Sequence, residues 1–158
     1  MLGLLGLKAG LSIITTVISV AYVVLQIIAN WTILEKAGEK GWKSLIPFYG
    51  EYTLYKIVWQ PKMYWIYLIL SVVQGVFNYL SDNVFQLTAL GVVFTLIYVV
   101  FMLLALALNL FFCRKLAFSF GKSSSFAIGL FFLYPIFSMI LAFGNSRYIG
   151  KSGPTNYL

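Results

Sequence analysis

Two short segments of the sequence place a nucleophile beside a base. Lys43 precedes Ser44, and Lys122 precedes Ser123. A neighbouring lysine amine can activate a serine hydroxyl. Adjacent side chains on a helix point in different directions, however, and both lysines suit an anchoring role at a cytoplasmic membrane surface. A membrane enzyme acting on lipid or peptide therefore stays a minor alternative, and we assign no catalytic residue.

Few residues in this chain could support other catalytic or metal-binding chemistry. There is no histidine, one cysteine (Cys113), and four acidic residues that are scattered along the sequence. General acid–base catalysis uses a group that titrates near neutral pH, and zinc sites use clustered His, Cys or acidic ligands. We therefore expect neither a cofactor nor a metal site.

Polar side chains recur at spacings of three and four residues inside three long apolar runs. This spacing places them on one face of each helix, and such faces turn toward one another in lipid. Matching depths predict that Asn30 lies near Asn109. The members of this polar seam are Ser19, Gln26, Asn30, Gln74, Asn78, Thr95 and Asn109. The seam is interpreted either as structural glue or as a hydrated groove for a headgroup, a peptide or a small solute.

The composition of the chain predicts which kind of helix carries the polar seam. The chain has 158 residues, of which 61% are hydrophobic and 9% charged. Soluble domains carry about 25% charged residues, so the natural solvent of this chain is a bilayer. Four apolar runs are long enough to span it, over residues 11–34, 63–80, 84–113 and 126–143. Because backbone groups in lipid must bond within their own segment, we expect an all-α polytopic membrane protein with four transmembrane helices.

Basic residues predict the orientation of these spans. The loops after the first and third runs hold eight lysines and arginines, and the opposite side holds three. The positive-inside rule then places the large loops in the cytoplasm and both termini outside. If Pro135 breaks the fourth run into a re-entrant pair, the C-terminus lies inside instead. The basic residues form no stripe with aromatic side chains, so we expect no nucleic-acid partner.

The segment between the first two runs carries both lysines and aromatic residues. Ser44 can cap a helix and Pro47 is tolerated in its first turn, which predicts a short interfacial helix over residues 45–59. Tyrosine and tryptophan prefer the headgroup level, and lysines extend toward anionic lipid. This segment is interpreted as an anchor or as a docking surface. The candidate partner-binding or interfacial residues are Trp42, Lys43, Pro47, Tyr49, Tyr52, Lys56, Trp59 and Lys122.

Two motifs, taken together, resemble a family of small bacterial multi-pass membrane proteins of unknown function. The first motif is KAG, then GW, then LIPFY within residues 36–57, and the second is FGK, then FAIGL, then PIF within residues 120–150. Relatives commonly carry Asn where Gly50 stands and Asp where Asn145 stands. The module also occurs fused to type I signal peptidase-like proteins, which implies an association with secretion or transport machinery rather than a mechanism.

These features predict one domain over residues 1–150, followed by a polar tail over 151–158, in the bacterial cytoplasmic membrane. The leading functional hypothesis is a non-enzymatic accessory or scaffold subunit of a transport- or secretion-related membrane complex. Its expected partners are membrane lipids and another membrane protein or a second copy of the chain. The alternative is a small homo-oligomeric transporter or channel that uses the polar seam as its path.

Overall fold

All secondary-structure elements in the part of the chain that the structure describes are helices. A computed structural model describes residues 2–85 and 88–151. The elements are α1 (Leu2–Lys36), the 3-10 helix η1 (Gly41–Leu45), α2 (Tyr49–Val58), α3 (Pro61–Tyr79), the π-helical turn η2 (Leu80–Val84), α4 (Ala89–Ser119), α5 (Ser124–Phe132) and α6 (Tyr134–Phe143).

Among the residues that the structure describes, three helical segments are long and apolar enough to cross a membrane. They are Ser12–Lys36, Pro61–Val84 and Ala89–Ser119. Each has at least 24 residues, and about 20 helical residues span a hydrocarbon core about 30 Å thick. The first three expected spans are therefore confirmed as membrane-length helices.

The fourth apolar run does not form a single spanning helix. It is divided into α5 with 9 residues and α6 with 10, which meet at Leu133 in a non-helical conformation. Pro135 lies in the first turn of α6, and a proline lacks the N–H that would continue the preceding helix. At about 1.5 Å per residue, neither helix is long enough to cross the core alone. The expected span over 126–143 is thus replaced by a helical hairpin.

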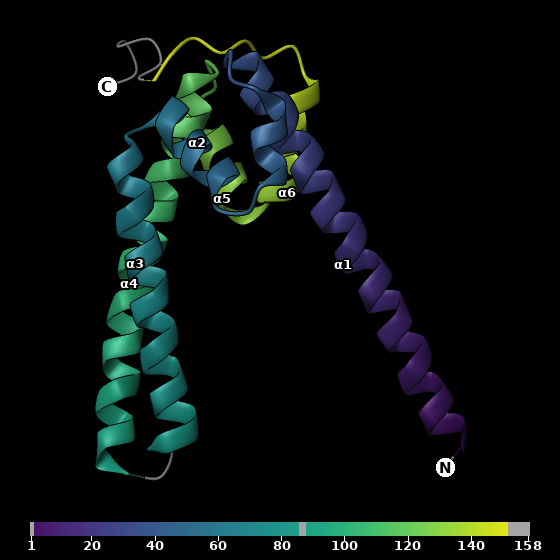
Figure 1. Cartoon of the computed structure of the whole chain (residues 1–158), viewed down its shortest axis with the longest axis vertical. Coiled ribbons are helices and arrows are strands. Elements are labelled where there is room, and N and C mark those ends of the chain that lie inside the picture. The colour runs from purple at the N-terminus through teal and green to yellow at the C-terminus, as the bar shows by residue number, and fades with distance from the viewer. Residues whose placement is uncertain (1, 86–87, 152–158) are drawn as a thin grey trace.

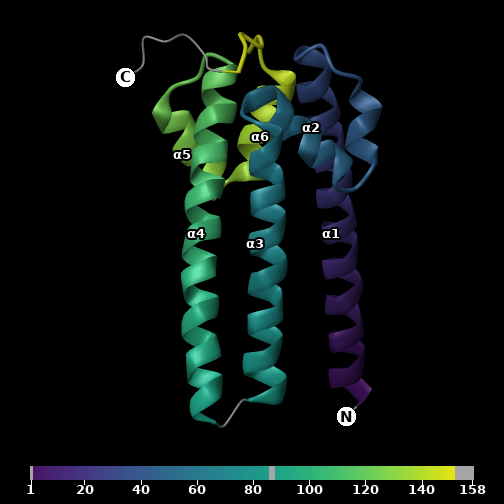
Figure 2. The same ribbon diagram turned by 60° about the vertical axis from the view of Figure 1, so that its left-hand side comes forward.

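The long helices are arranged as an open V, seen in Figure 1. Helices α3 and α4 pair side by side, whereas α1 leans away and packs against α6, η1 and α2 rather than against α3 or α4. The short helices fill the space between the two arms at one end, as both views show (Figures 1 and 2). The buried apolar core lies at this end, with Leu34, Val58, Leu116 and Leu141 fully enclosed.

This end is also the basic one. Of the 11 lysines and arginines, only Lys8 lies near the start of α1, and the other ten lie where α1 ends, α3 begins and α4 ends. We refer to it as the basic end. The last described residues are at the basic end as well, since the Ile149 N–H donates to the carbonyl oxygen of Ser119, where α4 ends. This arrangement fits the alternative in which Pro135 breaks the fourth run, because the α5–α6 hairpin returns the chain to the basic end.

Hydrogen bonds hold the C-terminal segment onto the basic end. The Lys36 amine donates to the carbonyl oxygens of Leu141 at 2.9 Å and Gly144 at 2.7 Å. The Tyr148 hydroxyl donates to the carbonyl oxygen of Ile57 at 2.6 Å. These bonds join α1 to α6 and the C-terminal segment to α2, so the short helices form one packed cap over the two arms.

The helix expected over residues 45–59 begins later than the sequence suggested. Residues 41–45 form η1, and α2 starts at Tyr49 after Phe48, which has a positive φ of 64°. Ser44 caps no helix; its hydroxyl donates to the carbonyl oxygen of Gly41 at 2.9 Å. Six of the ten residues of α2 are buried. Helix α2 is therefore a packed element of the cap rather than a helix lying on the surface of the bundle.

Candidate functional site

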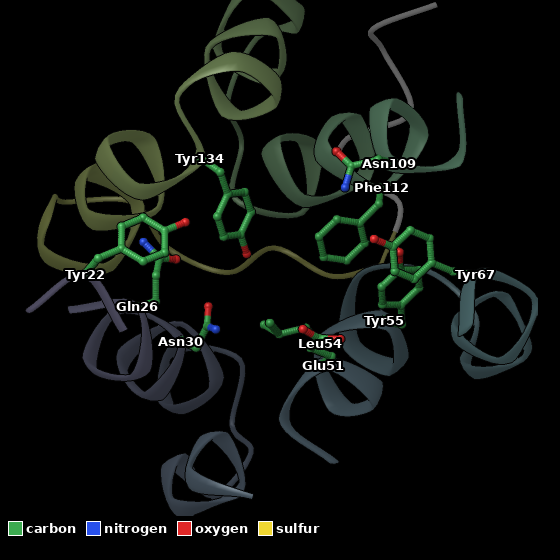
Figure 3. Close-up of a pocket in the computed structure, with 10 residues that line it drawn as sticks. All are labelled: Tyr22, Gln26, Asn30, Glu51, Leu54, Tyr55, Tyr67, Asn109, Phe112 and Tyr134. Carbon is green, nitrogen blue, oxygen red and sulfur yellow. The ribbon is translucent and has the colours of Figure 1, made fainter. Parts of the chain in front are cut away.

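A polar cavity lies between the two arms at the basic end. Its volume is about 310 Å³, within the range of about 300–1,000 Å³ typical of small-molecule sites. Helices α1, α2, α3, α4 and α6 all contribute to its wall, and their side chains point toward a common space in Figure 3. The lining residues are Tyr22, Gln26, Asn30, Glu51, Leu54, Tyr55, Tyr67, Asn109, Phe112 and Tyr134.

The α1 wall presents unsatisfied amides. Tyr22, Gln26 and Asn30 are four residues apart, so they lie on one face of α1. Gln26 Nε2 and Asn30 Oδ1 are buried, and within the described chain neither atom has a hydrogen-bond partner. A buried polar group left unpaired costs about 1–3 kcal/mol, so such groups call for a partner that the protein itself does not supply. The α1 wall therefore offers one donor and one acceptor to a cavity occupant.

The α2 wall presents the one carboxylate among the lining residues, that of Glu51. Burial raises the pKa of this carboxyl group, because the charged form loses hydration. Within the described residues, Glu51 forms no ion pair and no hydrogen bond, and no lysine or arginine lines the cavity. Glu51 is thus a partly desolvated acid without a counter-charge.

The lysines nearest to Glu51 in sequence are engaged elsewhere. Lys43 forms an ion pair with Glu39, and the Lys56 amine lies 2.9 Å from a carboxylate oxygen of the same residue. These two hydrogen bonds lower the pKa of Glu39. One acid of this segment therefore binds two cations, while the other faces the cavity with none.

Aromatic rings complete the wall. The Tyr55 ring stacks on Phe112 with centroids 4.4 Å apart, and Tyr67 lies 6.2 Å from Tyr55. Figure 3 shows Tyr134 projecting from α6 toward the middle of the cavity, and Tyr22 beside Gln26 on the α1 side. Burial raises the pKa of both Tyr55 and Tyr134, so their hydroxyl groups stay neutral at physiological pH.

A second cavity of about 290 Å³ adjoins the first. The two share Tyr22, Gln26, Asn30 and Glu51, and the second extends toward the turn between η1 and α2. Gly50 makes this approach possible, since a Cβ there would lie 2.9 Å from the Cα of Ser44. The acid and the two amides consequently stand at the junction of two hollows.

The structure brings only part of the polar seam to one place. Gln26, Asn30 and Asn109 line the same cavity, with Asn30 and Asn109 on opposite sides of it (Figure 3). The remaining members are bonded locally or to a neighbouring helix: Ser19 to the carbonyl oxygen of Thr15, Asn78 to Asp82 and Thr95 to Ser81, while Gln74 is half-buried on α3. Ser19 does not meet Gln74 or Thr95, because α1 leans away from α3 and α4 toward its beginning.

Most of the predicted partner-binding residues form an aromatic surface on another side of the basic end. Trp42, Tyr49 and Tyr52 follow one another with centroids 6.4 and 6.3 Å apart, and the Lys43 amine lies over the Tyr49 ring. A groove of about 560 Å³ adjoins this series, lined by Pro47, Phe48, Tyr49, Tyr52, Tyr64, Trp65 and Leu68. We refer to it as the aromatic groove.

Three predicted partner-binding residues lie outside both the aromatic groove and the Trp42–Tyr49–Tyr52 series beside it. Lys56 pairs with Glu39, Trp59 is half-buried at the end of α2, and Lys122 lies over the ring of Phe126 in the turn between α4 and α5. In the first Ser–Lys segment the two side chains bond to different partners, Ser44 to the carbonyl oxygen of Gly41 and Lys43 to Glu39.

Sequence reasoning missed Glu51 as a site residue. The four acids are scattered along the sequence, and none of them was predicted to belong to a site. A signal was present, because Glu51 follows the spacing of one helix face with Leu54, Tyr55 and Val58, three residues that are buried while Glu51 itself stays exposed. The tyrosines of α3 and α6 carried no such signal, since their convergence depends on the division of the fourth run.

Comparison with known families gives one match. The model of a family of unknown function, DUF5684, matches residues 42–151, which is more than half of the chain. The chain belongs to DUF5684. This confirms the resemblance to a family without an assigned activity. In this DUF5684 chain the match includes Glu51, Asn109 and Tyr134, whereas Gln26 and Asn30 precede it. No curated protein and no solved structure matches the sequence.

Proposed function

We propose that this chain is a non-enzymatic protein of the bacterial cytoplasmic membrane that binds a small polar molecule in the polar cavity. The observation that carries the proposal is the pairing of Gln26 Nε2 and Asn30 Oδ1, a buried donor and acceptor left without partners, at a cavity that also holds Glu51. Functional sites are where a protein tolerates such unpaired groups. A bound molecule that supplies the missing partners stabilises the cap.

The proposed topology places this cavity near the cytoplasmic face. Ten of the 11 basic residues gather at the basic end, which supports a cytoplasmic location for it under the positive-inside rule. In this arrangement α1, α3 and α4 cross the membrane and the α5–α6 hairpin enters it from the cytoplasmic side without crossing. The N-terminus is then outside and Lys151 is inside.

Native mass spectrometry of the protein, purified in a mild detergent, tests the proposal. We expect the wild-type protein to retain a non-covalently bound small molecule, and the Gln26→Leu/Asn30→Leu variant to lose it. Asn78→Leu, which removes an exposed amide far from the cavity, is the control and should keep the occupant. Equal occupancy of the wild type and the double variant contradicts the proposal.

A second candidate function is that of an accessory or scaffold subunit of a transport- or secretion-related complex. The aromatic groove favours it, because Phe48 is 68% exposed and Trp65 54% exposed beside it. Aromatic residues are enriched at protein interfaces, and these lie at the proposed cytoplasmic end of α3. Mild-detergent purification should then recover a partner membrane protein that Trp65→Ala releases. A stable monomer without any partner contradicts this function.

The transporter or channel alternative receives less support from the arrangement of the seam. Within the described residues, Gln26 and Asn30 of α1 line a common cavity with α4 at the basic end. Thr95 instead bonds to Ser81 near the opposite end, and α1 does not pack against α3 or α4. A path through the membrane would therefore need residues from further copies of the chain. Flux of a solute into vesicles that is abolished by Gln74→Leu would favour this alternative over a simple binding role.

A further inference from the structure

We propose that the occupant of the polar cavity is a small organic cation, an ammonium group that carries a neighbouring oxygen, held by Glu51 and by the surrounding aromatic rings. This inference rests on the proposed function, and it specifies the chemical class of the molecule that the cavity binds.

The first argument for a cationic ligand is the charge of the cavity wall. Glu51 is the charged residue among the ten that line the cavity, and the adjoining cavity also has no basic lining residue. This is notable at an end of the molecule where ten lysines and arginines gather. Lys43 and Lys56 are held by Glu39. An anionic ligand would meet an unpaired carboxylate here, whereas a cationic ligand supplies the counter-charge that Glu51 lacks.

The second argument for a cationic ligand is the number of aromatic residues in the cavity wall. Five of the ten lining residues are tyrosine or phenylalanine, contributed by α1, α2, α3, α4 and α6. Aromatic faces attract cations, and rings grouped around one space are the usual means of recognising alkylated ammonium groups. A strongly hydrated inorganic cation would instead want a cluster of oxygen ligands, and Glu51 provides the single carboxylate.

The third argument, for an oxygen close to the ammonium group, comes from the amides of Gln26 and Asn30. Gln26 Nε2 offers a donor and Asn30 Oδ1 an acceptor, both unpaired in the described chain. A hydroxyl or ester oxygen close to the ammonium group would accept from Gln26, and an N–H or O–H donor on the ligand would satisfy Asn30. The volume of about 310 Å³ suits a group of headgroup size rather than a folded peptide segment.

Two sources supply this chemistry: the headgroup of a zwitterionic lipid, and a free amine such as choline or ethanolamine. Helix α1 does not pack against α3 or α4, so in the proposed topology lipid can lie between them in the membrane beside the cavity. A soluble amine would enter from the aqueous side. Both place an ammonium group against the same carboxylate and rings.

Isothermal titration of the full chain in a maltoside detergent tests the inference, with choline chloride and ethanolamine hydrochloride as probes. We expect saturable choline binding that is at least tenfold weaker in Glu51→Gln, which keeps the shape of the side chain and removes its charge. Asp82→Asn removes an acid at the opposite end of the molecule and should leave binding unchanged. Tyr134→Phe should retain binding and Tyr134→Leu should lose it, with gel filtration confirming that each variant is folded.

Several results overturn the inference. They are equal choline affinity of the wild type and Glu51→Gln, displacement of choline by sodium at equal concentration, and binding of acetate at the same site. Nanodiscs of phosphatidylglycerol, with and without phosphatidylethanolamine, separate the two sources. Choline binding weakened at least tenfold by phosphatidylethanolamine supports a lipid headgroup, and unchanged binding supports a free amine.

The inference and the proposed function fail separately. If the bound molecule is lost in the Gln26→Leu/Asn30→Leu variant but kept equally by Glu51→Gln, the inference that it is a cation is wrong. The proposed binding function is then still supported. If the wild-type protein carries no bound molecule and does not bind choline, both the inference and the proposed function are contradicted.

Discussion

The amine of Lys36 lies 2.9 Å from the carbonyl oxygen of Leu141, a residue 105 positions later in the chain. The same amine bonds to the carbonyl oxygen of Gly144, where α6 ends. The last carbonyl groups of a helix have no partner within the helix, and a lysine that approaches them also interacts favourably with the helix dipole. Lys36 therefore fixes the end of α1 to the end of α6, the helix that carries Tyr134 into the cavity.

Replacing Lys36 by methionine should destabilise the cap. The variant keeps an apolar side chain of similar length but removes two charge-assisted hydrogen bonds, each worth about 1.5–3 kcal/mol when its partner is left unpaired. We expect a net loss of about 1–3 kcal/mol in the free energy of unfolding, measured in mixed micelles. Lys40→Met is the control, since Lys40 is exposed, and it should change the free energy by less than about 0.5 kcal/mol. Equal effects of the two variants would show that the Lys36 bonds contribute little.

The α5–α6 hairpin depends on a close approach at Gly129. A Cβ at this position would lie 2.3 Å from the Phe137 ring, so Gly129→Ala should displace the ring and destabilise the protein by about 1–3 kcal/mol. Gly75 lies in α3 with open space around it, and Gly75→Ala should be neutral or stabilise the helix by up to about 1 kcal/mol. Thermal unfolding of both variants checks this pair. Recovery of stability in Gly129→Ala/Phe137→Leu would assign the loss to the ring, whereas an unperturbed Gly129→Ala would contradict the hairpin packing.

The sequence predicted the three long helices, because length and apolarity suffice to identify them. The sequence did not determine whether the fourth apolar run forms one helix or two, since Pro135 is compatible with either a kinked helix or a break. The outcome depends on packing, with α5 against α4 and α6 against α1. Helix-face periodicity does not give the angle between two helices. Asn30 and Asn109 therefore line one cavity from α1 and α4, while Ser19 lies on the part of α1 that leans away from α3 and α4.

The stability of the ligand-free protein should depend on pH through Glu51. Its pKa is raised in the folded protein, so folding favours the protonated carboxyl group. The contribution of this group is therefore most favourable below the unfolded-state pKa of about 4.3, and is lost as the pH rises through the folded-state value. We expect Glu51→Gln to be more stable than the wild type at about pH 7–8, with the difference shrinking toward about pH 4, in unfolding experiments across this range.

Glu39 provides the opposite control for this pH dependence. The pKa of Glu39 is lowered by its bonds with Lys43 and Lys56, so its stabilising contribution is present at neutral pH and is lost as the pH falls through the folded-state value. Glu39→Gln should accordingly be less stable than the wild type at neutral pH. The same sign of change in both variants would contradict the different surroundings that we describe for the two acids.

Cysteine labelling tests the proposed topology. In a Cys113→Ala background, Lys62→Cys and Arg147→Cys should be protected from a membrane-impermeant maleimide in intact cells and should react after lysis. Asp82→Cys, in the turn between α3 and α4, should react in intact cells. All three parent residues are exposed, so access and not burial decides the outcome. Protection of Lys62→Cys together with reaction of Arg147→Cys in intact cells would mean that the chain crosses the membrane once more than α1, α3 and α4 allow.

The central claim is that water-accessible polar space exists beside α4 at the depth of Asn109. Asn109 lines the cavity, and its neighbour Leu110 is 44% exposed on the outer surface of the same helix. The decisive measurement is the rate at which a water-soluble maleimide reacts with Asn109→Cys and with Leu110→Cys in the Cys113→Ala protein reconstituted in nanodiscs. We predict rapid reaction at position 109 and little reaction at position 110, where lipid surrounds the helix. Equal and slow reaction at both positions would contradict the cavity and every functional proposal built on it.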